Sequence, residues 1–293
     1  MTTRPITANR AANGSVELKT KDQRPLISVV VAVRNGVETL QRCIDSVVNQ
    51  NFHSKELVII DGQSDDGTIE ILRNNAAHIN FWLSEQDNGI CDAWNKGIDH
   101  AQGKWICFIG ADDYLWQSDS LSKLAPNLEL MNPAYRVVYG KVATVSRRGN
   151  VTGIWGVPWL EAKKNFFIEM SIPHQGVMHH RGLFEEHGKF DQSFRIAGDY
   201  EFLLRELETA DAFFVPDVIV TGMQEGGLSS RPSLAKIALN EFRLARLKHG
   251  IKPTPLRWIW RYVKAMGKSW MASALGEKRA ESLLQKYRHI AHK

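Results

Sequence analysis

Between residues 26 and 110, short apolar runs alternate with segments in which apolar residues recur at helical spacing. The apolar runs, each expected to be a buried strand, are 26–33, 57–60, 79–83 and 105–109. The segments between them repeat apolar residues every three or four positions, as at Val37, Leu40 and Ile44. This alternation predicts βαβ units and an α/β fold whose parallel sheet is covered by helices on both faces.

A carboxylate or an amide follows each predicted strand, at Asn35, Asp61, Asp87 and Asp112. Ligands of open α/β sheets bind outside the carboxyl ends of the strands, so these residues should line one polar crevice. Asp112 is followed directly by Asp113, and paired carboxylates suit Mg²⁺ or Mn²⁺, which bridges to substrate phosphates. The alternative is a turn whose aspartate caps the following helix. The two commonest phosphate-binding glycine loops are absent from the sequence, so an anionic ligand here would need a cation.

Five motifs occur in a fixed order along the first 205 residues. They are Arg34-Asn35, Asp61-Gly-Gln-Ser-Asp-Asp-Gly-Thr68, Asp87-Asn-Gly-Ile-Cys-Asp-Ala-Trp-Asn-Lys-Gly97, Gly103-Lys-Trp-Ile-Cys-Phe-Ile-Gly-Ala-Asp-Asp113 and Gly198-Asp-Tyr-Glu201. In order and spacing they resemble a family 2 glycosyltransferase of the GT-A fold. The resemblance implies transfer of a sugar from a nucleotide-sugar, usually with Mg²⁺ or Mn²⁺, and inversion of the anomeric configuration.

The resemblance also implies roles for residues at the strand ends. Asp112 would be the metal ligand with Asp113 supporting it, although Gly110 stands where the family often has the first aspartate of Asp-x-Asp. Asp61 would contact the nucleobase, with Arg34 and Asn35 nearby. The alternative for Asp61 is a turn residue that stabilises an Asp-Gly pair.

The resemblance assigns three further residues to the donor site, namely Asp87, Asn95 and His174. Asn95 has an alternative role, because an asparagine also satisfies backbone groups by itself. His174 belongs to a His-Gln pair that lies near the donor and acceptor sugars in similar enzymes. His179 and His180 follow closely, but no Cys or Glu completes a tetrahedral metal site with them.

An inverting displacement needs a base that takes the proton of the acceptor hydroxyl. By resemblance that base is Asp199, which precedes the apolar stretch Phe202–Leu204. The alternative is that Asp199 caps the helix beginning there, and both roles are compatible. Glu201 is the rival candidate, but two residues further on a helix it points to another face.

The C-terminal segment 231–293 is strongly basic, with 15 Lys and Arg against 3 Asp and Glu, whereas the first 230 residues have 22 against 29. Within it, residues 256–274 form an amphipathic pattern with Arg257, Arg261, Lys264 and Lys268 on one face. The opposite side and its flank carry Leu256, Ile259, Trp260, Val263, Met266, Trp270 and Met271 together with Trp258 and Tyr262. Such a helix lies in an anionic membrane surface. The alternative is that its apolar face packs on the catalytic domain.

These features predict a disordered tail at 1–24, a GT-A domain at 25–230 and a helical basic tail at 231–293. The chain has no apolar run of about 18 residues, no signal-like N-terminus and only three, widely spaced cysteines. We therefore expect a cytoplasmic enzyme on the inner face of the cell membrane, which extends a saccharide or lipid-linked saccharide for a surface polysaccharide. The alternatives are a sugar nucleotidyltransferase and a non-catalytic saccharide-binding protein. A nucleic-acid partner is not expected, because the basic charge is confined to an amphipathic tail.

Overall fold

The computed structural model describes residues 6–8, 24–130, 134–227, 231–252, 255–277, 279–280 and 283–284. The strands are β1 Ile6–Ala8, β2 Ile27–Val33, β3 Lys55–Asp61, β4 Phe81–Ser84, β5 Trp105–Gly110, β6 Tyr114–Leu115, β7 Val137–Val145, β8 Val151–Trp155, β9 Val177–His180 and β10 Phe213–Gln224. The helices are α1 Leu40–Val48, α2 Thr68–Asn74, α3 Ile90–His100, α4 Ser120–Glu129, α5 Trp159–Phe166, α6 Gly182–His187, α7 Gly198–Leu207, α8 Ala235–Lys248 and α9 Pro255–Leu275, with 3₁₀ turns η2 His174–Gly176 and η4 Pro232–Leu234.

The strands form one sheet in the order β1-β4-β3-β2-β5-β9-β7-β10-β6, with β8 added beside β7. The four strands predicted from the apolar runs, β2 to β5, are mutually parallel, as expected. Beyond β5 the sheet is mixed, because β9 runs antiparallel to both β5 and β7. This half departs from the expected parallel pattern. Its strands β7 and β8 are joined by a short turn, and such a turn can connect only antiparallel strands.

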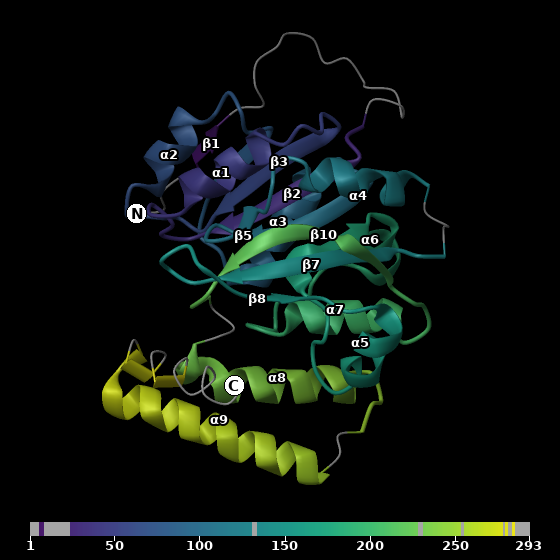
Figure 1. Ribbon diagram of the computed structural model, residues 1–293. Coiled ribbons are helices and arrows are strands. Elements are labelled where there is room, and N and C mark those ends of the chain that lie inside the picture. Colours follow the sequence, from purple (N-terminus) through teal and green to yellow (C-terminus); the bar gives the residue numbers. More distant parts are fainter. Residues whose placement is uncertain are drawn as a thin grey trace.

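Helices cover both faces of the sheet, as Figure 1 shows. Along β2 the side chains alternate between two buried clusters. Val29 and Val31 join a cluster that includes residues of α1 and α4. Val30 and Ala32 join a second cluster that includes residues of α3 and α7. Burial on both faces explains why β2 is apolar at every position but Ser28.

Strand β1 is a difference from the sequence-based expectation, which left residues 1–24 without structure. Ile6 to Ala8 pair antiparallel with β4, at the edge of the sheet. An edge strand presents unpaired backbone N–H and C=O groups, and the β-branched residues Ile6 and Thr7 suit a strand that pairs with them. Residues 1–5 and 9–23 lie outside the described part of the chain.

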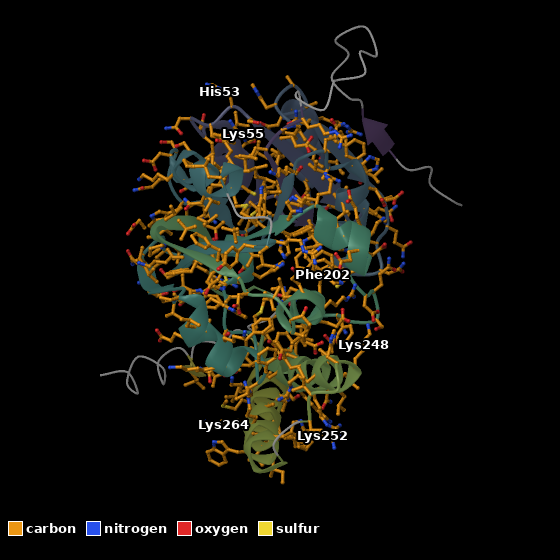
Figure 2. All side chains as sticks on the ribbon, turned by 90° about the vertical axis from the view of Figure 1, so that its right-hand side faces the viewer. His53, Lys55, Phe202, Lys248, Lys252 and Lys264 are labelled. Atoms are coloured by element: carbon orange, nitrogen blue, oxygen red, sulfur yellow. The ribbon has the colours of Figure 1, made fainter. Side chains whose placement is uncertain are left out.

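The C-terminal helices extend the molecule away from the sheet. Helix α8 packs on α7, and α9 lies against α8 and η4 (Figure 1). In Figure 2, His53 and Lys55 lie at one end of the molecule, and Lys252 and Lys264 lie at the other. No helix in the described residues is long and apolar enough to cross a bilayer.

Candidate active site

The carboxyl ends of the parallel strands lie level with one another. Asp61 at the end of β3 is in register with Val33 of β2 and Ser84 of β4, and Gly110 of β5 is in register with Ala32. The sheet therefore brings the polar residues that follow these strands to one edge, as the alternation of strands and helices predicts.

Asp61 is fully buried and its carboxylate is held by two serines. The backbone N–H of Ser64 donates to Oδ2 at 3.0 Å, and the Ser84 hydroxyl donates to the same oxygen at 2.6 Å. The Ser64 hydroxyl donates to Oδ1. These bonds fix the loop after β3, so the structure gives Asp61 the turn role that the sequence left open. A contact with a nucleobase stays a prediction.

Asn35 and Asp87 shape the same edge. Asn35 has a φ of 55°, and its Oδ1 accepts a hydrogen bond from the Asp65 N–H at 3.1 Å. The Asp87 carboxylate lies over Gly62, where a Cβ atom would come within 2.3 Å of Asp87 Oδ2. The side chain of Arg34 is exposed beside them. Glycine at position 62 therefore lets Asp87 approach the end of β3.

Asn95 is buried inside the protein rather than on the crevice surface. Its Nδ2 donates to the Phe190 carbonyl at 2.8 Å, and its Oδ1 accepts from the Phe190 N–H at 2.9 Å. The side-chain N–H and the side-chain oxygen of Asn95 are thus both hydrogen-bonded to the backbone of Phe190. The structure favours the second of the two roles that the sequence left open for Asn95, and it gives no reason to propose a donor contact.

Asp112 and Asp113 differ in their surroundings. Asp113 is buried, with Oδ2 accepting from the Gly110 N–H at 3.2 Å and Oδ1 from the Gln224 N–H at 3.1 Å. Asp112 is only partly buried. Burial and, secondly, the Asp112 charge raise the pKa of Asp113 to about 8. A neighbouring like charge disfavours the ionised form of a carboxylate, and a bound cation would favour it.

Gly110, at the first position of the carboxylate motif, lies against the Asp112 and Asp113 side chains. A Cβ atom there would lie 2.6 Å from Asp112 Oδ1 and 3.3 Å from Asp113 Oδ2. The Asp112 carboxylate therefore folds back over the space that a side chain at position 110 would take. Any larger residue at 110 requires Asp112 to move.

Asp199 lies in the first turn of α7, where its Oδ1 accepts a hydrogen bond from the Tyr200 N–H at 2.8 Å. Its side chain is 20% exposed, and its Oδ2 lies 3.8 Å from Nδ1 of His174. Burial raises the pKa of Asp199 to about 6 and lowers that of His174 to about 3. The pair therefore consists of a basic carboxylate beside a neutral imidazole at neutral pH.

The turn η2 connects this pair to the strand ends. The His174 ring stacks on Phe108 of β5 with the ring centroids 6.1 Å apart, only two residues before Gly110. The Gln175 carbonyl accepts a hydrogen bond from the Thr221 hydroxyl of β10 at 3.2 Å. Strands β5 and β10 thus hold both η2 and, through Gln224, Asp113. The turn η2 and Asp113 are far apart in the sequence, and they lie near each other only because the sheet brings β5 and β10 together.

Glu201, the rival base, is used elsewhere. It is fully buried in an ion cluster with Arg205, with Lys248 at 2.8 Å and with His249 at 3.5 Å. Its pKa is lowered despite its burial, because Arg205 and Lys248 donate hydrogen bonds to it. A paired, ionised carboxylate of low pKa is a poor base, so Asp199 remains the candidate.

Arg42 and Gln224 lie near the carboxylates and were not predicted from the sequence. Arg42 of α1 donates to the Asp112 carbonyl at 2.7 Å and to Oε1 of Gln224 at 2.9 Å. Its guanidinium also lies 4.6 Å from the centroid of the Tyr114 ring. A basic residue on an exposed helix face carries no sequence signal for such a role.

The sequence was compared with families and with known proteins. The family model described as "Glycosyl transferase family 2" matches residues 28–181. This chain belongs to glycosyl transferase family 2. Within the family, a PGL/p-HBAD biosynthesis glycosyltransferase of Mycobacterium bovis (strain BCG / Pasteur 1173P2) is 33% identical over 184 residues, which cover 62% of this chain and 69% of the relative. A putative teichuronic acid biosynthesis glycosyltransferase of Bacillus subtilis, TuaG, is 32% identical over 103 residues, covering 34% and 40%.

Solved structures of glycosyltransferases have the same fold. S. aureus TarS 1–349 in complex with UDP-GlcNAc superposes with a TM-score of 0.59 at 17% identity, covering 85% of this chain and 73% of that one. Full TarS is matched over only 39% of its length. The mannosyltransferase PcManGT from Pyrobaculum calidifontis, in complex with GDP-Man and Mn²⁺, has a TM-score of 0.58 at 19% identity, covering 92% and 81%. The family 2 glycosyltransferase described here therefore has a GT-A fold, as expected.

Proposed function

We propose that this family 2 glycosyltransferase is an inverting enzyme that moves a sugar from a nucleoside-diphosphate sugar to a saccharide acceptor, with Asp199 as the general base. The observation that carries the proposal is the position of Asp199. It lies beside the neutral His174, and the same strands place His174 and the Asp112–Asp113 pair at one sheet edge. A base and a diphosphate site at the same edge fit a displacement between acceptor and donor.

The chemistry follows from the state of Asp199. With a pKa of about 6, the carboxyl is mostly ionised at neutral pH and basic enough to take the proton of a sugar hydroxyl. The hydroxyl oxygen then attacks the anomeric carbon from the side opposite the nucleoside diphosphate, whose bond to that carbon breaks. One displacement of this kind inverts the configuration. The His174 ring is buried beside Asp199, and burial is the main cause of the raised pKa of Asp199.

We assign the binding of the donor's diphosphate group to Asp112 and Asp113. Two carboxylates with substrate phosphates are a usual ligand set for Mg²⁺, and the partly exposed Asp112 is followed directly by the buried Asp113. Among the described residues no three acidic, His or Cys side chains form a complete metal site by themselves, so phosphate oxygens would complete it. Asp112 would hold a divalent ion, whose charge would stabilise the departing diphosphate. Asp113, bonded through both oxygens, supports that carboxylate.

Helix α9 gives the enzyme a surface for lipid-linked acceptors. Its buried side carries Ala265 and Ala272, and Ser269 donates to the Pro232 carbonyl at 3.3 Å. The apolar stripe faces outward instead, with Trp260 62% and Trp270 72% exposed. Its other exposed members are Ile259, Val263 and Met266. The packing alternative weighed for this helix would have buried that stripe.

The basic residues of α9 differ in their surroundings, because one pairs with the protein body and another is exposed to solvent. Arg261, expected on a free cationic face, is paired with Glu169 of the protein body. Lys264 is exposed beside the stripe, with its Nζ 5.0 Å from the Trp260 ring centroid. The side chains of Leu256 and Arg257 lie outside the described residues. Exposed Trp, apolar and Lys side chains on one helix suit an anionic membrane surface. We propose peripheral attachment there, on the cytoplasmic side, for synthesis of a surface polysaccharide.

The proposed base is tested by Asp199→Asn. We expect turnover to fall about 10²–10⁴-fold while the affinity for the nucleotide-sugar, measured by calorimetry, stays within twofold. Asp211→Asn is the matched control, because Asp211 bonds only Trp159 and Lys163 in the described structure, beyond the far end of α7. Undiminished turnover in the Asp199 variant would remove Asp199 as the base.

The proposed metal-diphosphate site is tested separately by Asp112→Asn. This variant should lose the part of the nucleotide affinity that depends on Mg²⁺ or Mn²⁺, whereas the affinity measured in a chelator should not change. An unaltered metal dependence would contradict the role of Asp112. A panel of nucleotide-sugars, tested by thermal stabilisation, would identify the donor.

A further inference from the structure

Glu241, on the helix beyond the expected catalytic domain, is bonded to the segment just before Asp199. Its Oε1 accepts from the Arg195 N–H at 2.9 Å. Its Oε2 accepts from the N–H groups of Ile196 at 2.7 Å and Ala197 at 2.9 Å. The side chain is only 8% exposed, so one buried carboxylate bonds three consecutive backbone amides.

These amides lead directly into α7, whose first turn carries Asp199. The N-cap of α7 is Ala197, whose side chain cannot accept a hydrogen bond. The N-terminus of a helix leaves backbone N–H groups without partners and carries a partial positive charge. A carboxylate is the strongest acceptor a side chain can offer there. Glu241 therefore binds, from α8, the amide of the N-cap residue and the two amides that precede it.

The same segment also contacts α3. A Cβ atom at Gly198 would lie 2.3 Å from the Cys91 sulfur, and Cys91 Sγ lies 3.3 Å from the Phe194 carbonyl. Residues 194–198 thus contact both Cys91 and Glu241. Asp199 follows this segment directly, so its position depends on both contacts.

We infer that Glu241 is a positioning residue for the catalytic base: it fixes the backbone of residues 195–197 and thereby the place of the Asp199 carboxylate. The inference rests on the proposed role of Asp199. It also makes α8 part of the catalytic unit, although the change in composition after residue 230 suggested a separate tail.

The negative charge of Glu241 has an electrostatic consequence as well. Asp199 faces His174 from η2, Cys91 from α3 and Glu241 from α8. Burial holds His174 uncharged, and it raises the pKa of the Cys91 thiol to about 12, so Glu241 is the charged neighbour among them. Its charge adds to the effect of burial in raising the pKa of Asp199. An uncharged side chain at 241 should lower that pKa.

The test is Glu241→Gln in the full-length chain, with kcat normalised to the fraction of protein that binds the nucleoside diphosphate. We expect kcat to fall at least tenfold with the KM for the donor unchanged. The acidic limb of the pH profile should also move to lower pH. The matched control is Glu206→Gln, because Glu206 is a buried glutamate at the far end of α7, paired with Arg136 and His187. The control should lose stability but keep kcat and the acidic limb.

A double variant separates positioning from general destabilisation. If Glu241 acts through Asp199, then Glu241→Gln should cause no further loss in residual donor turnover when Asp199 is already Asn. A multiplicative loss, or a normal kcat with an unmoved acidic limb in Glu241→Gln alone, would overturn the inference. Full activity of Asp199→Asn would instead overturn the proposed base. Glu241→Asp, which keeps the charge but shortens the reach, replaces the Gln variant if that variant does not fold. It should also lower kcat, whereas wild-type kcat would overturn the inference.

Discussion

Nδ1 of His174 lies 3.8 Å from Oδ2 of Asp199, although the two residues are separated by 25 positions in the sequence. The distance exceeds that of a hydrogen bond. His174 is held by packing instead: its ring centroid lies 5.0 Å from that of Trp94 and 6.1 Å from that of Phe108. Its Nε2 is buried and has no hydrogen-bond partner among the described residues. The aromatic packing therefore fixes an imidazole next to the proposed base.

The pH dependence of the reaction should report Asp199. The base must be ionised, and burial raises its pKa to about 6. We expect kcat/KM to rise with pH through an acidic limb near 6 and to fall as pH drops below it, because the proton then blocks the base. His174 should add no limb in this range, since its pKa is lowered to about 3. An activity that is constant from pH 5 to 8 would contradict the assignment.

Substitutions of His174 should distinguish the contribution of its ring to stability from the contribution of its ring nitrogens to turnover. His174→Ala opens a cavity among aromatic rings and should lower the free energy of unfolding by about 3 kcal/mol, as for large-to-small core changes. His174→Phe keeps the ring and should fold with near-normal stability but lose turnover about tenfold, a loss of 1.4 kcal/mol in transition-state stabilisation. Denaturant unfolding and steady-state kinetics measure the two effects. Equal turnover in the Phe variant and the wild type would show that the nitrogens are dispensable.

Restoring a side chain at position 110 should damage the site rather than improve it. A Cβ atom there meets Asp112 Oδ1 at 2.6 Å, so Gly110→Ala must displace the carboxylate. We expect the metal-dependent affinity for the nucleotide to fall about tenfold, or 1.4 kcal/mol, and Gly110→Asp to do no better. Gly267→Ala is the control, because a Cβ atom at that helical glycine meets nothing within 4 Å. Tighter metal binding in Gly110→Asp would show that Asp112 moves without cost.

The outward stripe of α9 should determine membrane binding. Replacing Trp260 and Trp270 together by Ser removes the two most exposed aromatic side chains of the helix and should abolish flotation with vesicles that contain anionic lipid. Turnover with a water-soluble acceptor should not change. Leu130→Ser removes an 86% exposed apolar side chain just after α4 and should leave flotation intact. Undiminished flotation of the double Trp variant would defeat the proposed attachment through α9.

The parallel half of the fold was predictable, because β2 to β5 are local apolar runs separated by helical periodicity, and the polar residues at their ends follow from that order. The mixed half was less predictable. Strand β9 follows a 3₁₀ turn and β1 is three residues long, so neither has a periodic pattern of useful length. Single residues were harder still. Asn95 was assigned to the donor from its motif, yet its amide pairs with the backbone of Phe190.

The sequence by itself determined the fold class, the family and the edge of the sheet that carries the carboxylates. These follow from local periodicity and motif order, which adjacent residues encode. Only the tertiary structure decided which carboxylates are paired and which are available. It placed Glu201 in an ion cluster, Asp199 beside His174 and Glu241 under the segment before α7. The physical reason is that burial and charge neighbours set the properties of a carboxylate, and these come from segments far apart in the chain.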